Sequence, residues 1–459
     1  MRRLAIALVA GTLAACMVGP DYRRPTISAP TAFRYEIAGA RDTANVAWWT
    51  QFGDPVLDAL IDEALANNID VKIAAANVEQ AAAVLRQARS ALYPQANAGA
   101  SAGGKRESEQ VGSVYSSDVL AGASWEIDLW GRVRRLSEAA RAQVLASEEA
   151  RLGVVLSLVA SVANTYLQLR ALDEQLLIAT RTKQAYAESV KLFELQFEYG
   201  VQSRMTVEQA RTQYETAAAA IPSIESQIAQ AENALSILLG RDPGPIPRGQ
   251  SINALTMPEV PAGIPSEVLE RRPDILQAEQ ALVAANAQIG AAKALYFPTI
   301  SLTGALGVVS TDLDSLFKGA TGAWSYQGSI VGPIFTAGAI SGQVRQAEAA
   351  RQAAELGSAA TIQRAFADVE DALVARAKLV EQLAAQGRLV GASQKYSELA
   401  RLQFEGGVAP YMTVLQAEQQ LFPAELNEAQ LRASLLAATV AIYKAMGGGW
   451  VIEAEKRTR

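Results

Sequence analysis

The sequence predicts an α+β membrane protein with an internal two-fold repeat, in which each half contributes a β-hairpin and a very long helical hairpin. Residues 195–207 (LQFEYGVQSRMTV) and 402–414 (LQFEGGVAPYMTV) match at nine of thirteen positions, which indicates a duplication. Alternating apolar and polar segments predict strands, and proline-free heptad seams predict long helices. Half of the 459 residues are apolar but only 6% are aromatic, which favours closely packed Ala-rich helices over a thick globular core.

The N-terminus carries an export signal. Residues 1–16 read MRRLAIALVAGTLAAC, with two basic residues, a short apolar run and small residues before the single Cys of the chain. The step Leu13-Ala14-Ala15-Cys16 resembles a bacterial lipobox, which predicts removal of residues 1–15 and acylation of Cys16. The alternative is a conventional Ala-x-Ala cleavage site beside an unmodified Cys. Met17 follows in place of Asp, which by resemblance to bacterial lipoproteins favours the outer membrane.

Composition argues against several functions. The absence of His removes the usual general base, the common zinc ligand and the near-neutral pH switch. One Cys allows no intrachain disulfide, and a net charge of −6 argues against binding nucleic acid. The sequence also contains no P-loop, GxSxG or HExxH motif. We therefore expect no enzyme activity, catalytic residue, cofactor or metal.

Each half is expected to contain two strands. A helix should end at Tyr93-Pro94 and again before Pro298, because proline disfavours helix in the residue that precedes it. From Val119 to Leu129 apolar and polar residues alternate, as they do again from Ile300, and a further strand is expected over about 326–335. This pattern is typical of a barrel wall between lipid and water, and equally of a half-buried soluble strand. Four aromatic residues near the strand ends are candidates for a membrane-interface girdle or for core packing: Trp125, Trp130, Trp324 and Tyr326.

Long helices follow the strands, over about 132–198 and 342–404. Each ends at glycine, and a second helix should return over about 203–239 and 411–446, kinked or broken at Pro222 and Pro423. The longest apolar stretch, 152–163, is shorter than the ~20 residues of a transmembrane helix, so strands should provide any further membrane insertion.

One chain cannot complete this architecture. Four strands cannot close a wide barrel, and helices of this length cannot bury their seams alone. Three chains would supply twelve strands and enclose an aqueous lumen, because eight strands leave room only for side chains. We therefore expect an obligate homotrimer in which the helices continue the barrel wall.

The chain resembles the TolC-type outer-membrane efflux channels, in their lipoprotein (OprM/NodT-like) branch. The resemblance covers essentially the whole mature chain. Its motifs are VGPDY after Cys16, WW before FGDP at 52–55, WEIDLWGR at 125–132, ERRPD at 270–274 and the two Gly-Val turns. It implies a trimer with a 12-stranded transmembrane β-barrel, a periplasmic α-helical coiled-coil barrel and a small mixed equatorial domain. It also implies a periplasmic adaptor (membrane fusion) protein and an inner-membrane efflux pump as partners.

Combined with this resemblance, the predicted elements divide the chain into nine segments. They are a signal peptide (1–15), a lipidated N-terminal segment with equatorial region and first helix (16–90), a first β-barrel hairpin (91–131), a first helical hairpin (132–239), an equatorial linker (240–270), a helix (271–297), a second β-barrel hairpin (298–336), a second helical hairpin (337–446) and a C-terminal tail (447–459).

The resemblance also assigns candidate functional residues. Gly200-Val201 and Gly407-Val408 would be the periplasmic tips that contact the adaptor. Residues at the family's pore constriction would be Tyr411, Met412, Gln416 and Gln419. Several relatives carry Asp and Arg where this chain has Gln416 and Gln419, so a salt-bridged, cation-sensitive gate is not expected; Tyr411 and Met412 form an apolar constriction or simply pack between helices. Arg272-Pro273-Asp274 is interpreted as a structural cap.

The function expected from these features is a passive trimeric exit duct in the Gram-negative outer membrane. It would be lipid-anchored through Cys16, extend into the periplasm, and carry drugs or other small toxic compounds. Two alternatives remain open at this point: a type I secretion duct for proteins or peptides, and a lipid-anchored coiled-coil scaffold without a pore.

Overall fold

The computed structural model describes residues 17–26, 32–35, 47–106, 113–260, 265–447 and 450–451. The chain forms two compact units, and it passes between them several times. The first unit contains residues 1–27, 75–149 and 277–361, and the second contains residues 28–74, 150–276 and 362–459. Long helices therefore contribute one segment to each unit.

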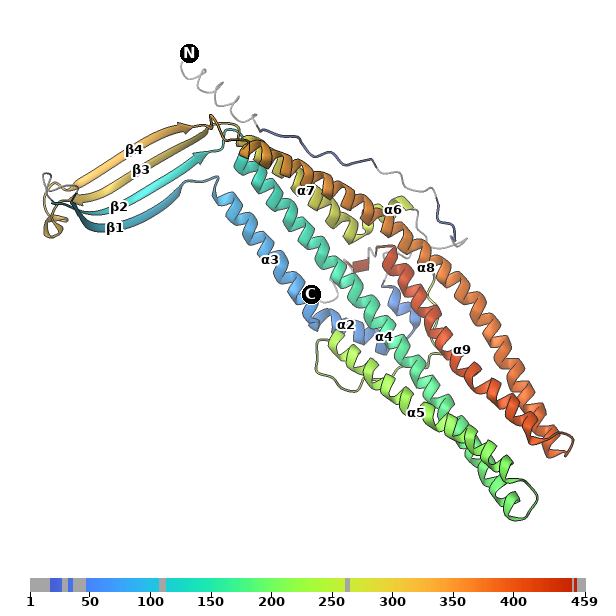
Figure 1. Ribbon diagram of the computed structural model, residues 1–459. Coiled ribbons are helices and arrows are strands. Elements are labelled where there is room, and N and C mark those ends of the chain that lie inside the picture. Colours follow the sequence, from blue (N-terminus) through green and yellow to red (C-terminus); the bar gives the residue numbers. More distant parts are fainter. Residues whose placement is uncertain are drawn as a thin grey trace. The chain divides into compact units, whose positions relative to one another are not determined.

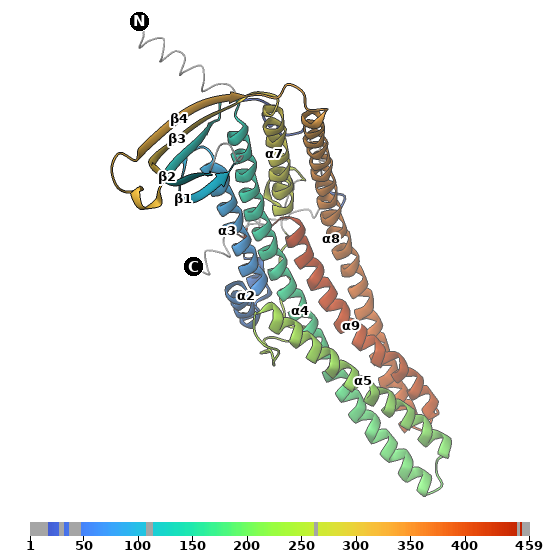
Figure 2. The same cartoon turned by 60° about the vertical axis from the view of Figure 1, so that its left-hand side comes forward.

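The first unit contains a four-stranded antiparallel sheet in the order β1-β2-β3-β4 (Figures 1 and 2). Its strands are β1 (Gln95–Arg106), β2 (Ser113–Ile127), β3 (Thr299–Ser310) and β4 (Gly322–Val331). The pairing of β2 with β3 joins the two repeats. The prediction for the last strand was wrong: β4 begins and ends about four residues before the expected 326–335. It ends ahead of Pro333, which lacks an N–H to continue the ladder.

The helices repeat the duplication residue for residue. Helices α4 (Arg132–Glu198) and α8 (Ala339–Glu405) each have 67 residues, and their starts are 207 residues apart. Helices α5 (Arg204–Leu238) and α9 (Tyr411–Ala445) each have 35 residues and start 207 residues apart as well. At 1.5 Å per residue, α4 and α8 are each about 100 Å long. The shorter helices α3 (Ile69–Ser90) and α7 (Pro273–Ala294) precede the two β-hairpins.

Of the two outcomes expected at the prolines, a kink or a break, the break does not occur. Pro222 lies inside the continuous helix α5, and Pro423 lies inside α9. Ile224 and Phe422, close to the two prolines, are both buried in one apolar cluster of the second unit. Packing on these helix faces therefore outweighs the loss of one backbone hydrogen bond at each proline.

The core of the second unit is built around aromatic rings. Trp48 and Trp49 of η1 (Trp48–Phe52) and Trp450 are fully buried, and the Trp48 ring stacks on Tyr443 at 5.4 Å. Trp450 thus belongs to the core, although the sequence placed it in a C-terminal tail. Helix α2 (Pro55–Asn67) begins beside this cluster, and the short helix α6 (Pro265–Arg271) lies within the segment interpreted as a linker.

Helix α4 is more apolar than its longest uninterrupted stretch indicated. One 18-residue window has a mean hydropathy of 1.6, enough to cross a membrane by length and composition. However, 56% of this window is buried. Val155, Val159 and Val162 lie in the core of the second unit, as in the core helix of a globular unit.

Candidate functional site

The register of the sheet places all four apolar strand faces on the same side. Trp125 pairs with Leu302 across β2 and β3, and Leu306 pairs with Trp324 across β3 and β4. The residues on this face are Ala96, Ala98, Ala100, Val119, Ala121, Ala123, Trp125, Ile127, Ile300, Leu302, Leu306, Val308, Trp324, Tyr326 and Ile330. The opposite face carries most of the polar residues, including Asn97, Ser101, Asp118, Glu126, Ser301, Thr303, Ser325, Gln327 and Ser329.

Strand length and strand edges fit a membrane wall. The four strands have 12, 15, 12 and 10 residues, and a transmembrane strand needs about 9–11. Among the described residues, β1 pairs only with β2, and β4 pairs only with β3. An unpaired strand edge is not tolerated in hydrocarbon, so β1 and β4 require strands from outside this chain if the sheet crosses a bilayer.

The structure divides the four candidate girdle residues into two pairs. The indole of Trp125 donates to the carbonyl of Leu92 at 3.0 Å, and that of Trp130 donates to the carbonyl of Pro298 at 2.7 Å. These two rings therefore hold the junctions between strands and helices. Trp324 and Tyr326 are 75% and 80% exposed and stack in parallel on the apolar face of β4. They are the pair with the exposure that an interfacial girdle requires.

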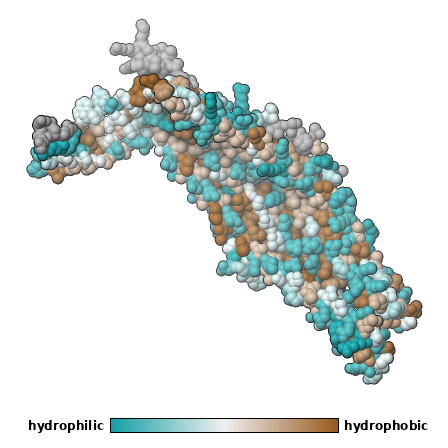
Figure 3. Space-filling view, in the orientation of Figure 1, coloured by the Kyte–Doolittle hydropathy of each residue, from teal (hydrophilic) through white to brown (hydrophobic). Residues whose placement is uncertain are grey.

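The two Gly-Val turns have the same backbone. Gly200 and Gly407 have φ of 71° and 72°, in the left-handed region that favours glycine. Each Gly N–H donates three residues back, and each following Val N–H donates five residues back. Val201 and Val408 are 69% and 81% exposed. Figure 3 shows hydrophobic residues at the exposed end of the α8–α9 hairpin.

The four candidate pore residues do not act as one group. Met412, Gln416 and Gln419 are exposed, and their spacing of four and three residues places them on one face of α9. Tyr411 is buried on another face, where its ring lies 4.2 Å from Phe193 and 5.6 Å from Phe404. Within the single chain, Tyr411 therefore packs between helices. The other three side chains remain free to face a pore.

A buried carboxylate lies behind this face. Glu418 is 5% exposed, and its Oε1 forms an ion pair with the guanidinium of Arg401 of α8, at an N–O distance of 2.8 Å. Its Oε2 is buried and has no hydrogen-bond partner among the residues that the structure describes. Burial raises the pKa of Glu418, although Arg401 acts in the opposite direction. Burial, reinforced by the charge of Glu418, raises the pKa of Tyr411 to about 12.

Sequence reasoning missed Glu418, although a signal was available. Tyr411, Leu415, Glu418 and Phe422 follow one another at steps of four, three and four, and all four are buried. Glu418 thus occupies a core position of a heptad seam, where a carboxylate is unusual. Gln416, two residues earlier, is exposed and lies on a different face of α9.

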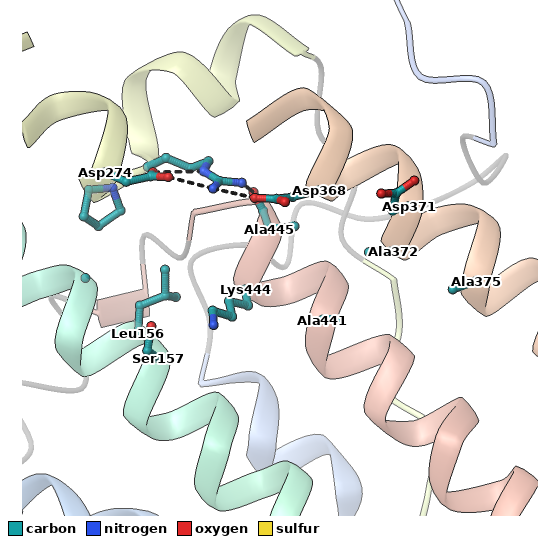
Figure 4. A pocket seen from close by; sticks show the side chains of 13 residues that line it. Leu156, Ser157, Asp274, Asp368, Asp371, Ala372, Ala375, Ala441, Lys444 and Ala445 are labelled. Atoms are coloured by element: carbon teal, nitrogen blue, oxygen red, sulfur yellow. Dashed lines mark hydrogen bonds and ion pairs between the residues drawn. The ribbon is translucent and has the colours of Figure 1, made fainter. Parts of the chain in front are cut away.

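The Arg272-Pro273-Asp274 motif borders a cavity of about 530 Å³ within the second unit (Figure 4). Arg272 bridges Asp274 at 2.7 Å and Asp368 at 2.8 Å, and donates to the carbonyl of Ala445. Burial opposes its charge, but hydrogen bonds to the two carboxylates outweigh burial and hold the pKa of Arg272 above its usual value. The motif joins α7 to α8 and α9. No group of three or more potential metal ligands occurs in the described part of the chain.

A sheet with one apolar and one polar face is the pattern of an outer-membrane barrel wall, and in this chain it is joined to duplicated long helices. The chain belongs to the outer membrane efflux protein family, whose model matches residues 60–241 and 264–448. It is therefore an outer-membrane efflux channel component that extends into the periplasm. Residues 1–16, on which the predicted export signal, the lipobox-like step and Cys16 fall, lie outside the described residues.

Named relatives agree with this assignment over nearly their full length. The cation efflux system protein CusC of Escherichia coli O6:H1 is 37% identical over 96% of this chain and 97% of its own. The toluene efflux pump outer membrane protein TtgC of Pseudomonas putida is 38% identical, over 97% and 95%. Among solved structures, the open state of the MtrE outer membrane channel of Neisseria gonorrhoeae has a TM-score of 0.87 at 34% identity, over 95% and 99%.

Proposed function

We propose that three copies of this chain form a continuous duct, with a 12-stranded barrel in the outer membrane and a helical barrel below it. The observation that carries the proposal is the sheet register, which aligns the apolar faces of all four strands. A wall between lipid and an aqueous lumen requires this arrangement. The free edges of β1 and β4 would pair between neighbouring protomers, so that the closed barrel has no unpaired edge.

The duct would receive small toxic compounds from an inner-membrane pump through a periplasmic adaptor. The exposed turns at Gly200-Val201 and Gly407-Val408 are the proposed adaptor contacts, because their apolar side chains are free in the single chain. Met412, Gln416 and Gln419 would line the narrow end of the pore. Acylation of Cys16 would add an anchor in the outer membrane.

Overall sequence similarity does not distinguish one cargo from another. Relatives named for cation efflux and for toluene efflux are 37% and 38% identical to this chain. Both names describe efflux, which favours an efflux duct over a protein-secretion duct. We propose that the pump selects the cargo and that the channel provides a passive exit.

The sheet register allows the lipid-facing side of the sheet to be tested by substituting two adjacent residues of β3 that lie on opposite faces. Leu306 lies on the apolar face of β3, and Ala305 lies on the other face. Leu306→Arg should impair barrel assembly, because a charge toward lipid costs about 2–4 kcal/mol near the bilayer midplane. Ala305→Arg should assemble and change the ion selectivity in planar bilayers.

Each outcome is decisive. Equal tolerance of both Arg variants would contradict a sheet with one lipid-facing side. Absence of conductance from the assembled protein, even in the double variant Met412→Gly/Gln416→Gly with its constriction widened, would contradict a channel and support the scaffold alternative. Retained lipid labelling with unchanged mass in Cys16→Ser would separately contradict the anchor.

A further inference from the structure

The segment that directly follows Cys16 is held along α4 and α7 of the first unit. We call residues 17–24 the strap. The N–H of Val18 donates to the carbonyl of Trp130 at 3.1 Å. The carbonyls of Val18 and Gly19 accept from Arg135 at 3.3 and 3.2 Å, and that of Pro20 accepts from Asn286 at 2.9 Å. Three successive carbonyls of the strap are therefore recognised by side chains.

Glycines on three segments allow the strap to approach this closely. A Cβ on Gly290 of α7 would lie 2.7 Å from the carbonyl oxygen of Val18. A Cβ on Gly19 would lie 2.4 Å from the Cα of Gly290, and Gly19 has φ of 105°. A Cβ on Gly131 would lie 2.5 Å from the Cγ of Met17. The contact is thus a backbone-to-backbone fit that side chains at these positions would prevent.

Arg135 completes the seat for the strap. It is 1% exposed and occupies a heptad core position of α4, since Ala139, Ala142 and Ala146 are buried at steps of four, three and four. Its guanidinium pairs with Asp21 and Glu138, each at 2.9 Å. A buried guanidinium is costly unless its donors are satisfied, and the strap supplies two carbonyls and one carboxylate. Asp21 of the strap and Glu138 of α4 therefore share the compensation of the Arg135 charge, and the strap carbonyls satisfy further donors of its guanidinium.

The far end of the strap is tied to α7 by charge. Glu279 accepts from the hydroxyl of Tyr22 at 3.2 Å and pairs with Arg24 at 2.8 Å. These contacts are partly exposed and contribute less than the buried contacts of Arg135. They fix the direction in which the strap leaves the seat.

We infer that Gly131, Arg135, Asn286 and Gly290 form a docking seat for the strap, and that this seat sets the point where the acyl chains of the N-terminus enter the membrane. The point is the β2–α4 junction, because Cys16 is bonded to Met17, which contacts Gly131. One residue spans at most 3.8 Å between Cα atoms. Arg135 acts as a positioning residue for the anchor. The inference rests on the proposed acylation of Cys16.

The test uses the full-length acylated protein in outer-membrane vesicles. Gly290→Val places a branched side chain against the carbonyl of Val18, and Gly290→Ala places a single Cβ there. Amide hydrogen exchange in a peptide covering 17–24 should become about tenfold faster or more in Gly290→Val, corresponding to about 1.4 kcal/mol of lost docking. Asp21→Asn, which keeps the backbone contacts, should give a smaller increase.

The matched control is Gly357→Ala in α8, where an added Cβ meets nothing within 4 Å. Gly290→Ala and Gly357→Ala both raise helix propensity, so faster strap exchange in the first alone reports the seat and not a weakened helix. Unchanged exchange in Gly290→Val and Gly290→Ala would overturn the seat.

Metabolic labelling with a photoreactive fatty acid locates the anchor. Cross-links should map to peptides around residues 125–132 and 297–299 in the wild type, and should spread to other peptides in Gly290→Val. Cross-links that are equally spread in the wild type would overturn the position of the anchor. Absence of acylation by mass, with exchange still dependent on Gly290, would overturn the proposed lipid anchor and the entry point inferred from it, while the seat itself would stand.

Discussion

Arg401 of α8 and Glu418 of α9 are joined by a 2.8 Å ion pair in which the carboxylate is buried and the guanidinium is half exposed. Tyr186 of α4 also reaches this point, donating to the carbonyl of Glu418 at 3.5 Å. Burial raises the pKa of the Tyr186 hydroxyl, and the nearby Glu418 charge adds to this effect. Glu425 and Arg181 form a second pair between α9 and α4. The helical hairpins are thus connected behind the proposed pore face.

The Glu418 carboxylate should make the stability of this region depend on pH. Its folded pKa is raised, so the folded state holds the proton more tightly than the unfolded state does. Stability is therefore greatest below the unfolded pKa of about 4.3 and falls as pH rises through the folded pKa. We expect hydrogen exchange of the α8–α9 hairpin to slow as pH falls through this window, after correction for the intrinsic rate. Glu418→Gln should flatten the profile.

The control for this prediction is Glu398→Gln, which removes an exposed carboxylate paired with Lys395 on the same helix as Arg401. Its pH profile should match that of the wild type, because exposed pairs of this kind contribute about 0–1 kcal/mol. An unchanged slope in Glu418→Gln would mean that the buried carboxylate does not titrate in this range.

Replacing the glycine in either of the two turns by any residue with a side chain should destabilise that turn. Gly200→Ala and Gly407→Ala should each destabilise their hairpin by about 1–2 kcal/mol, because an L-residue is strained in the left-handed conformation. No neighbouring atom contributes, since an added Cβ at either position meets nothing within 4 Å. Local hydrogen exchange would measure the loss. Gly391→Ala, in the regular part of α8, should be neutral or stabilising.

The exposed face of α9 predicts a specific cross-linking pattern in the trimer. Gln416→Cys should form a disulfide between protomers if these residues meet near the axis. Three equivalent thiols can form only one disulfide per trimer, so about two thirds of the chains at most should run as a dimer. Lys378→Cys, at an exposed position of α8 that is remote in sequence from the Gly-Val turn, is the control and should remain monomeric under the same oxidation. Equal dimer yields from both variants would move the constriction elsewhere.

A buried hydrogen-bond network supports the core of the second unit. The carboxylate of Asp54 caps α2 through Val56 N–H at 2.9 Å and accepts from the hydroxyl of Tyr166 at 2.8 Å. Tyr166→Phe should cost about 1–3 kcal/mol, because it leaves this carboxylate with one donor fewer. Chemical denaturation would measure the loss. Tyr199→Phe, at an exposed tyrosine, should change stability by less than about 0.5 kcal/mol.

Local patterns predicted the features that depend on a few neighbouring residues. The turns at Gly200 and Gly407 follow from a repeated motif and a backbone conformation that favours glycine. The long helices follow from seams without proline. The expectation of a helix break at Pro222 and Pro423 was wrong, because distant packing partners keep each helix continuous. It also misplaced Trp450, whose burial depends on Trp48 and Trp49 some 400 residues earlier in the chain.

The candidate pore illustrates the same limit. The resemblance to the family grouped Tyr411 with Met412 as pore candidates, but adjacent residues on a helix point about 100° apart. Tyr411 packs against Phe193 and Phe404, which come from two other helices. The buried position of Glu418 was missed, although the periodicity of Tyr411, Leu415, Glu418 and Phe422 contained the signal for it. The identity of its partner, Arg401, depends on how α8 and α9 are aligned.

The pairing of the four strands imposes a rule of parity on the evolution of the wall. Each strand pairs residue by residue with its neighbour, and the apolar side alternates with a period of two. An insertion of one residue in β3 would reverse every later side chain, exchanging Leu302 with a polar neighbour at the membrane surface. An insertion of two would only lengthen the strand. Descendants of this chain should therefore change strand length by even numbers, unless a bulge absorbs the odd residue.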